Sequence, residues 1–374
     1  MITHPDKPRV LIFSQRNIFG RDLFRCAHYE FEDIISQIDS AELLAPQANP
    51  LGLRPEIARR IAFHAPVALN PGVVRTRAKG QYDLFLMICG APGDLLMFNA
   101  VRNWREICKA SICLIDELWV REMSDCRYFL RILENFDVVM LYYSQSVQPL
   151  SEQLGRKCVF LPPGVDALRF CPYPERSRRV VDVYSIGRRS DVTHRKLLRM
   201  AAENGVFYLY DSIAGNQAIN STEHRDLFVS VLKRSRYFIV NPGLIDRPDK
   251  RGNQSEAGNR YFEGSAAGAI LVGERPTNEE FERLFNWPDA LIHLPYDSDE
   301  IGRVIKELDR EPERQDRIRK ANVAQALMRH DWVYRWEAML KRAALEPLPQ
   351  LLQRKQRLRN LAEAICETTR GADD

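Results

Sequence analysis

Residues 241–274 read NPGLIDRPDKRGNQSEAGNRYFEGSAAGAILVGE. The apolar run before them, residues 237–240, predicts a buried strand that ends at Asn241, and a long polar loop with three glycines follows. A short helix is expected over residues 259–267, and Gly268 ends it just before the next apolar run. This strand–loop–helix–strand unit is typical of a parallel α/β sheet, in which the helix begins at the carboxyl ends of the strands.

The start of that helix is a candidate phosphate site. Free backbone N–H groups and the helix dipole favour an anion there. Gly258 would let a phosphate approach the backbone closely. Glu263, one turn into the helix, could accept hydrogen bonds from two ribose hydroxyls. The plain alternative is a loop–helix–strand connection with a solvated glutamate.

A second candidate stretch is VDVYSIGRRSDVTHRKLL, residues 181–198. The expected strand ends at Gly187, and four cations follow in one loop and the first turn of a helix. They are Arg188, Arg189, Arg195 and Lys196. Cations just past a strand end could hold a diphosphate and stabilise its charge as it leaves. A solvated basic loop is the alternative.

The rest of the chain alternates in the same way, with short apolar runs between amphipathic segments. The expected strands are residues 10–14, 82–90, 111–115, 137–143 and 159–161 in the first half, and 181–186, 206–210, 237–240, 269–272 and 290–294 in the second. The proline-rich stretch LPPGVDALRFCPYPERSRR, residues 161–179, interrupts this alternation and reads as a linker. The sequence therefore predicts two α/β domains.

The composition excludes several classes of protein. The 374 residues carry a net charge of +4, a near-balance that gives no argument for nucleic-acid binding. The eight cysteines form no CxxC pair and fit neither a zinc site nor a disulfide framework. No apolar run approaches the roughly 18 residues that span a bilayer, and the polar N-terminus does not resemble a signal peptide. We expect a cytoplasmic protein, with peripheral contact to the inner membrane face left open.

Residues 137–336 resemble GT-B glycosyltransferases, most closely glycosyltransferase family 4 and the related spore-maturation-type bacterial enzymes. LPPGVDALRFCP is similar to the linker that precedes the donor domain, and SIGRR to the turn that binds the donor phosphates. SEAGNRYFEGSAAGAILV resembles the Glu-x7-Glu region, with Glu263 as its second glutamate. HDWVYRW, residues 330–336, is similar to the closing segment of the spore-maturation-type enzymes.

The resemblance implies a GT-B fold, that is, two Rossmann-like domains that face a central cleft. It places an acceptor-binding domain at residues 1–165, a linker at 166–180, a nucleotide-sugar domain at 181–340, and a helical segment that crosses back to the first domain at 341–374. The implied activity is transfer of a sugar from a nucleoside-diphosphate sugar to a glycan, lipid or small-molecule acceptor, as in polysaccharide biosynthesis. Configuration would be retained, and neither a metal nor a cofactor would be needed.

The resemblance also implies roles for single residues. Arg188 and one of Arg195 or Lys196 would contact the diphosphate, the amides of Gly258 and Asn259 the distal phosphate, and Glu263 the ribose. The first glutamate of the motif falls on Ser255, with Glu256 one position away, which leaves the sugar open. The candidate catalytic residues are Arg188, Arg195, Lys196, Glu263 and Asp116, and the candidate donor-binding residues are Gly187, Ser255, Glu256, Gly258, Asn259 and Arg260.

Three features of the first half bear on the acceptor. The loop SQRNIFGRD follows the first strand and supplies Arg16 and Gly20, the latter for close approach to the donor. Asp116 follows another strand end and could deprotonate an acceptor hydroxyl, although capping of the next helix is the plainer role. His28, within a helix, reads as structural.

Two weaker patterns in the sequence have plainer explanations. Asp297 and Asp299 form a DxD, but Ser298 or Asp299 as a helix N-cap is the better interpretation, and no metal is expected. Residues 53–64 with Arg54, Arg59 and Arg60 could form a basic amphipathic helix. With Arg75, Arg77 and Lys79 nearby it could contact anionic lipid, and a solvated helix face is the alternative.

Two other functions remain open. A nucleotide-sugar epimerase of the same fold would need no acceptor. A non-catalytic nucleotide-sugar-binding protein is compatible with Ser255 in place of the glutamate.

Overall fold

The computed structural model describes residues 7–64, 69–175, 177–211 and 220–370, and it divides into two compact units. Unit 1 comprises Met1–Pro162, Asn216–Ser221 and Arg335–Gln353, and unit 2 comprises Pro163–Gly215, Thr222–Tyr334 and Arg354–Asp374. Each unit is an α/β layer structure around one parallel sheet.

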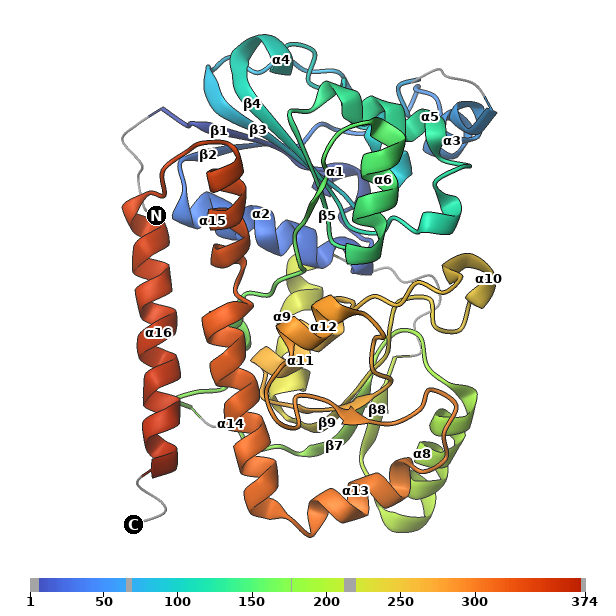
Figure 1. Ribbon diagram of the computed structural model, residues 1–374, viewed down its shortest axis with the longest axis vertical. Coiled ribbons are helices and arrows are strands. Elements are labelled where there is room, and N and C mark those ends of the chain that lie inside the picture. Colours follow the sequence, from blue (N-terminus) through green and yellow to red (C-terminus); the bar gives the residue numbers. More distant parts are fainter. Residues whose placement is uncertain (1–6, 65–68, 176, 212–219, 371–374) are drawn as a thin grey trace. The chain divides into compact units, whose positions relative to one another are not determined.

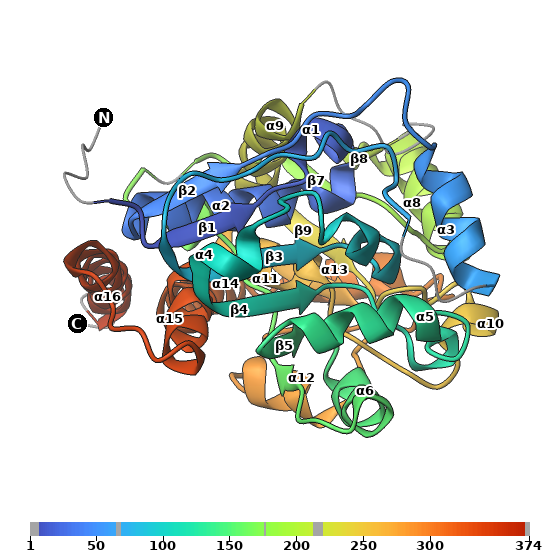
Figure 2. The ribbon, with the colours of Figure 1, turned by 90° about the horizontal axis from the view of Figure 1, so that it is seen from above.

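The sheet of unit 1 has six strands in the order β2-β1-β3-β4-β5-β6. Their bounds are β1 Val10–Phe13, β2 Ala41–Leu44, β3 Tyr82–Cys89, β4 Cys108–Ile115, β5 Val138–Leu141 and β6 Val159–Phe160. All of these pairings are parallel, and Figure 2 shows β3 and β4 side by side with their carboxyl ends at the same edge. The central strands are apolar and buried over most of their length because helices cover both faces of such a sheet.

The helices of unit 1 are α1 Arg16–Phe19, α2 Cys26–Ile38, α3 Pro55–His64, α4 Trp104–Ile107, α5 Arg127–Leu130 and α6 Val147–Leu154. Helix α2 lies along one face of the sheet (Figure 1) and is buried at most of its positions. Its apolar residues fall at helical spacing, as the sequence predicted.

The sheet of unit 2 has five parallel strands in the order β11-β10-β9-β7-β8. They are β7 Val181–Ser185, β8 Tyr208–Tyr210, β9 Ser235–Val240, β10 Ile270–Gly273 and β11 Ile292–His293. The helices of this half of the chain are α7 Ala167–Phe170, α8 Asp191–Asn204, α9 Ser221–Lys233, α10 Pro248–Arg251, α11 Asn259–Ala266, α12 Glu279–Leu284, α13 Ile301–Asp309 and α14 Pro312–Arg329.

The last two helices, α15 Trp332–Arg342 and α16 Pro349–Arg370, pass through both units. Within unit 1, the indole N–H of Trp336 donates to Asp39 at 2.8 Å. Within unit 2, the Arg354 guanidinium contacts Asp166 and Asp331, each at 2.7 Å. The C-terminal chain is therefore part of the structure of each unit.

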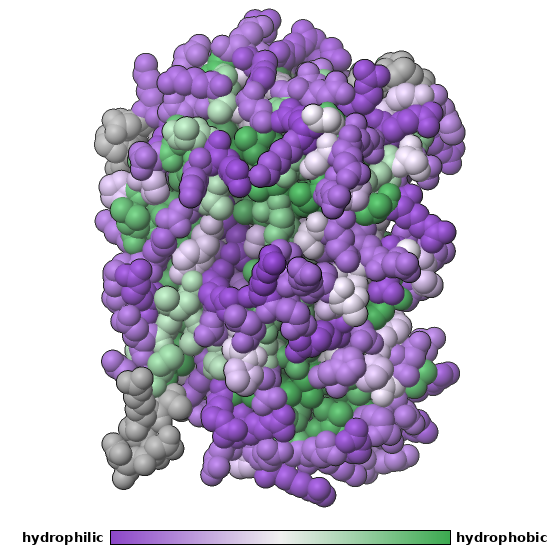
Figure 3. Space-filling view, in the orientation of Figure 1, coloured by the Kyte–Doolittle hydropathy of each residue, from purple (hydrophilic) through white to green (hydrophobic). Residues whose placement is uncertain are grey.

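Figure 3 shows one face of the molecular surface. In the view of Figure 3 it is mostly hydrophilic, with smaller hydrophobic areas. Along the residues that the structure describes, no helix is both long and apolar enough to cross a bilayer.

Candidate functional site

The strand order of unit 2 fixes where its loops diverge. β8 and β9 lie on opposite sides of β7, so the loops after β7 and β9 leave the sheet in opposite directions. Open parallel sheets bind ligands outside the carboxyl ends of the strands at such a switch point. Gly187 and Arg188 follow β7 there, and Asn241 follows β9.

Arg188 joins these two loops. Its Nη1 lies 2.9 Å from a carboxylate oxygen of Asp246, and 51% of its side chain is exposed. Gly187 has a φ of +85°, which favours glycine, and its N–H donates to Asp211 at 3.1 Å. Arg189 holds the same carboxylate at 2.9 Å. The loop after β7 is thus fixed while the Arg188 guanidinium remains accessible.

Helix α11 begins at the same edge of the sheet, with Gly258 as its N-cap. Gly258 has no side chain to cap the first amides, and among the residues that the structure describes nothing lies within 4 Å of the point where a Cβ would sit on it. Gly264 faces the sheet instead, where an added Cβ would lie only 2.4 Å from the Leu271 side chain. The helix therefore packs tightly on the sheet and keeps open space at its N-terminus, as a phosphate site requires.

Glu263 lies between two arginines. It is 1% exposed and forms ion pairs with Arg225 of α9 and, at 2.8 Å, with Arg260 of its own helix. Burial opposes its charge, but the Arg260 and Arg225 guanidiniums outweigh that effect and lower the pKa of the carboxyl. The three side chains carry one net positive charge beside the N-terminus of α11.

Ser255 and Glu256 are buried in the loop before α11. The Ser255 hydroxyl accepts from the N–H of Thr277 at 3.1 Å, and Glu256 accepts from the Gln254 amide at 3.1 Å. The first bond holds the loop against the residues before α12, and the second lies within the loop.

Arg195 and Lys196 lie farther along α8. Arg195 lines a surface groove with Asp299, and Lys196 lines another with Arg303 of α13. The structure thus turns both toward the α13 side, whereas Arg188 points to the loop after β9.

The DxD pattern has a local structural role. Asp297 accepts from the Ser190 hydroxyl at 2.7 Å. The N-cap of α13 is Glu300, so the prediction that Ser298 or Asp299 caps this helix was wrong. The chain makes one more turn before the helix begins, and there the Ser298 hydroxyl accepts from the N–H of Glu300 at 3.2 Å.

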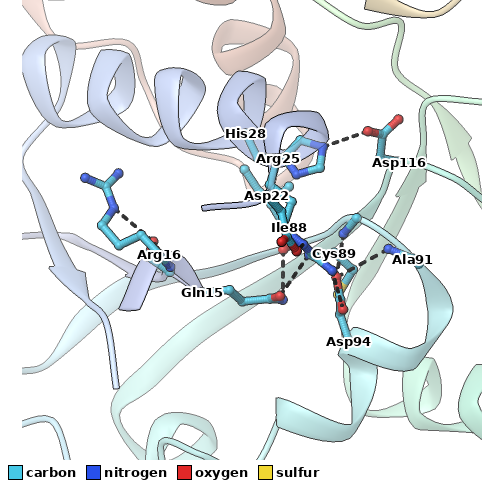
Figure 4. Close-up of polar contacts among 12 residues, drawn as sticks. Gln15, Arg16, Asp22, Arg25, His28, Ile88, Cys89, Ala91, Asp94 and Asp116 are labelled. Atoms are coloured by element: carbon cyan, nitrogen blue, oxygen red, sulfur yellow. Dashed lines mark hydrogen bonds and ion pairs between the residues drawn. The ribbon is translucent and has the colours of Figure 1, made fainter. Parts of the chain in front are cut away.

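In unit 1, Asp116 follows β4 and pairs with a histidine of α2. Its Oδ2 lies 2.7 Å from Nε2 of His28, and both side chains are buried (Figure 4). Asp116 caps no helix, because the next helical turn has Trp119 as its N-cap. The plainer role expected for Asp116 was therefore wrong, and His28 acquires a partner at the carboxyl edge of the sheet.

Neighbouring loops of unit 1 are also fixed by charge. Arg25 binds Asp94 at 2.5 Å and Gln15 at 3.0 Å (Figure 4). Arg16 pairs with Asp33 at 2.8 Å. An added Cβ on Gly20 would lie 2.2 Å from the Arg16 carbonyl oxygen, so packing within its own turn requires glycine there.

Sequence reasoning missed three partners in these sites, namely Arg225, Asp246 and the pairing of His28. Arg225 is 38 residues from Glu263, and His28 is 88 residues from Asp116. Arg225 carries no local signal beyond being a charged residue on a helical face that also bears Phe228. The only sequence signal for the His28–Asp116 pair is the position of Asp116 at the end of a predicted strand.

His224 provides a pH test of the charged cluster. Its ring stacks on Phe228, and burial, followed by Arg260 and Arg225, lowers its pKa to about 4. Between pH 6.5 and 4 the unfolded chain therefore binds a proton that the folded chain does not, so the free energy of unfolding falls as the pH falls. Between pH 7.5 and 5.5, we expect the free energy of unfolding measured in urea to fall by about 1 kcal/mol more for wild type than for His224→Phe.

The matched control is His293→Phe, at a half-exposed histidine, which should lose stability as wild type does. Equal losses in wild type and His224→Phe would contradict the described cluster.

Comparisons with known proteins bear on the family and the fold. Residues 188–341 match a family model described as glycosyl transferase-like. No curated protein matches the sequence. Among solved structures, HepE from Anabaena in complex with UDP-glucose has a TM-score of 0.52 at 11% identity, over 90% of this chain and 99% of that one. An alpha-glucosyltransferase in complex with UDP-glucose and DNA has a TM-score of 0.52 at 13% identity, over 91% of this chain and 100% of that one.

The family-model match covers Arg188, Glu263 and the HDWVYRW segment, and the likeness of fold extends over both units. The predicted GT-B fold is confirmed, while the closer resemblance to family 4 stays a prediction. The chain therefore has the GT-B fold, and its residues 188–341 are similar to the glycosyl transferase-like family.

Proposed function

We propose that the protein transfers a sugar from a nucleoside-diphosphate sugar, held at the carboxyl edge of the unit 2 sheet, to a hydroxyl group of an acceptor held by unit 1. The observation that carries the proposal is the open N-terminus of α11 beside the Arg225–Glu263–Arg260 cluster. Backbone amides and excess positive charge at a strand edge suit a diphosphate.

Arg188 could exchange its ion-pair partner when the donor binds. In the structure its partner is the carboxylate of Asp246. A donor phosphate would replace that carboxylate, since a guanidinium binds either oxyanion with the same planar geometry. Arg188 would then stabilise the charge that develops on the leaving diphosphate. We propose that this charge stabilisation needs no metal ion, and that the protein needs no cofactor.

Glu263 fits the proposal as a positioning group. Both of its oxygens contact guanidiniums, so it fixes Arg260 and Arg225 as well as serving as the proposed ribose acceptor. Gly187, Ser255 and Glu256 would shape the loops around the sugar. Arg195 and Lys196 are proposed as phosphate contacts only because of the resemblance to GT-B glycosyltransferases.

The acceptor class is proposed from the resemblance as a glycan, a lipid-linked molecule or a small molecule, within polysaccharide biosynthesis in the cytoplasm. An acceptor other than nucleic acid is part of the proposal. The solved alpha-glucosyltransferase contains DNA, so DNA belongs in any acceptor screen.

Retention of configuration is proposed on the likeness to family 4. The His28–Asp116 pair is one observation that favours inversion of configuration instead. A carboxylate–imidazole pair can take the proton of an acceptor hydroxyl that attacks opposite the leaving group, which inverts the anomeric centre. The anomeric configuration of the product, read by proton NMR, distinguishes the two courses.

Donor binding is the first prediction. Nucleoside diphosphates and nucleotide-sugars should raise the Tm of the native protein by several degrees through mass action, with or without EDTA. Arg188→Ala should abolish the shift, whereas Arg199→Ala, an exposed arginine on α8, should retain it. No shift across a broad nucleotide panel would contradict the donor site. An epimer released without acceptor would support the epimerase instead.

Acceptor activation is the second prediction. If Asp116 takes the acceptor proton, Asp116→Asn should lower kcat about 100-fold or more. The Tm shift caused by the donor should be unchanged, because the donor residues lie in unit 2. Asp125→Asn, in the same unit, serves as the control. A wild-type kcat in Asp116→Asn would exclude this role.

A further inference from the structure

Helix α3 packs its alanines into the core and leaves two isoleucines exposed. Ala58 and Ala62 are buried, while Ile57 is 46% and Ile61 is 37% exposed. Residues four apart share a face of a helix, so the two isoleucines stand together on the outer face. Leu51, just before the helix, is 96% exposed. An exposed group of large aliphatic side chains marks an interaction site more often than a single one does.

Positive charge is concentrated around these residues. Between Leu51 and Gly80 the chain has six basic residues and one acidic residue, whereas the remaining 344 residues have 48 basic and 49 acidic. The net charge of this segment, +5, therefore exceeds the +4 of the whole chain. All six basic side chains are exposed, namely Arg54, Arg59, Arg60, Arg75, Arg77 and Lys79.

The two parts of this segment are joined through the backbone. The N–H of Asn49 donates to Gly72 at 2.7 Å, and the N–H of Val74 donates to Gln47 at 2.9 Å. This pairing brings the chain before α3 beside Val74, which is itself 40% exposed, and Arg75 follows. We call the exposed residues of 51–61 and 74–79 the α3 surface.

Acidic neighbours are few. Glu56 is exposed on α3. The charges of Glu122, Asp125 and Arg59 all act on the pKa of the Cys126 thiol. Arg54 and Arg60 flank the isoleucines and are the better residues to change.

We propose that the α3 surface docks unit 1 on an anionic lipid bilayer. Isoleucine and leucine side chains would enter the boundary between headgroups and acyl chains, and the arginines would contact lipid phosphates. The combination favours a bilayer over a purely ionic polymer, since a polymer gives no environment for three aliphatic side chains. This inference does not depend on the donor site.

The test is co-sedimentation of the full chain with vesicles of phosphatidylcholine alone or with 30% phosphatidylglycerol, on the order of the anionic content that attracts basic segments. Wild type should bind the anionic vesicles and be released by high salt. Each arginine near the surface contributes about fivefold, so Arg54→Gln with Arg60→Gln should weaken binding at least about tenfold. Ile57→Gln with Ile61→Gln should weaken it about tenfold without changing charge.

Leu227→Gln, at an exposed leucine of α9, is the matched control and should bind as wild type does. Binding that the isoleucine changes do not affect would overturn the proposal, as would no binding to anionic vesicles. A DNA oligonucleotide is tested in parallel. Binding of DNA that is lost with the arginines, together with no lipid binding, would assign the surface to nucleic acid and overturn the proposal as well.

Discussion

Parallel pairing of every strand in the two sheets is the constraint on which the rest of the structure depends. Parallel strands need helical crossovers, and these cover both faces of the sheet, so the strands are buried and apolar. Polar groups are therefore concentrated at the strand ends, on the edge strands and in the loops. Because all carboxyl ends lie at one edge of a sheet, the loops after β7 and β9 bring Arg188 to Asp246 although 58 residues separate them.

A buried ionic contact fixes the C-terminal end of unit 2. Asp331 is fully buried and accepts from the N–H groups of Ala167 and Val333, each at 2.9 Å, as well as from Arg354. A buried carboxylate that loses its partner costs about 3–5 kcal/mol. This contact joins the PPGVDA stretch, the HDW stretch and α16, so three segments that are far apart in sequence form one structural element.

The sequence predicted most of the fold because its signal is local. Apolar runs at residues 82–90 and 181–186 became β3 and β7 with shifts of one residue at their ends. Strand β2 was missed, since AELL is short, carries a glutamate and is only partly buried at the edge of its sheet. Edge strands lack the continuous apolar run by which buried strands are recognised.

Less of the candidate site could be predicted, because its contacts depend on tertiary structure. The N-terminus of α11 was predicted from a loop, a glycine and a helix adjacent in the chain. The Arg225–Glu263 pair required α9 to pack beside α11, and the His28–Asp116 pair required α2 to cross the end of β4. Lys196 was expected at the phosphates from its nearness to Arg188 in sequence, yet it lies on the α13 side of α8. Proximity in the sequence does not determine which way a side chain points.

The central claim is that the carboxyl edge of the unit 2 sheet holds the donor, and hydrogen–deuterium exchange with and without a nucleotide-sugar tests it most directly. Amides bonded to a bound diphosphate exchange more slowly. The account predicts that protection on binding is concentrated in peptides covering residues 186–190 and 256–262, with little change in peptides from α13 or α3. Protection confined to other segments, or none with any nucleotide-sugar that binds, would contradict it.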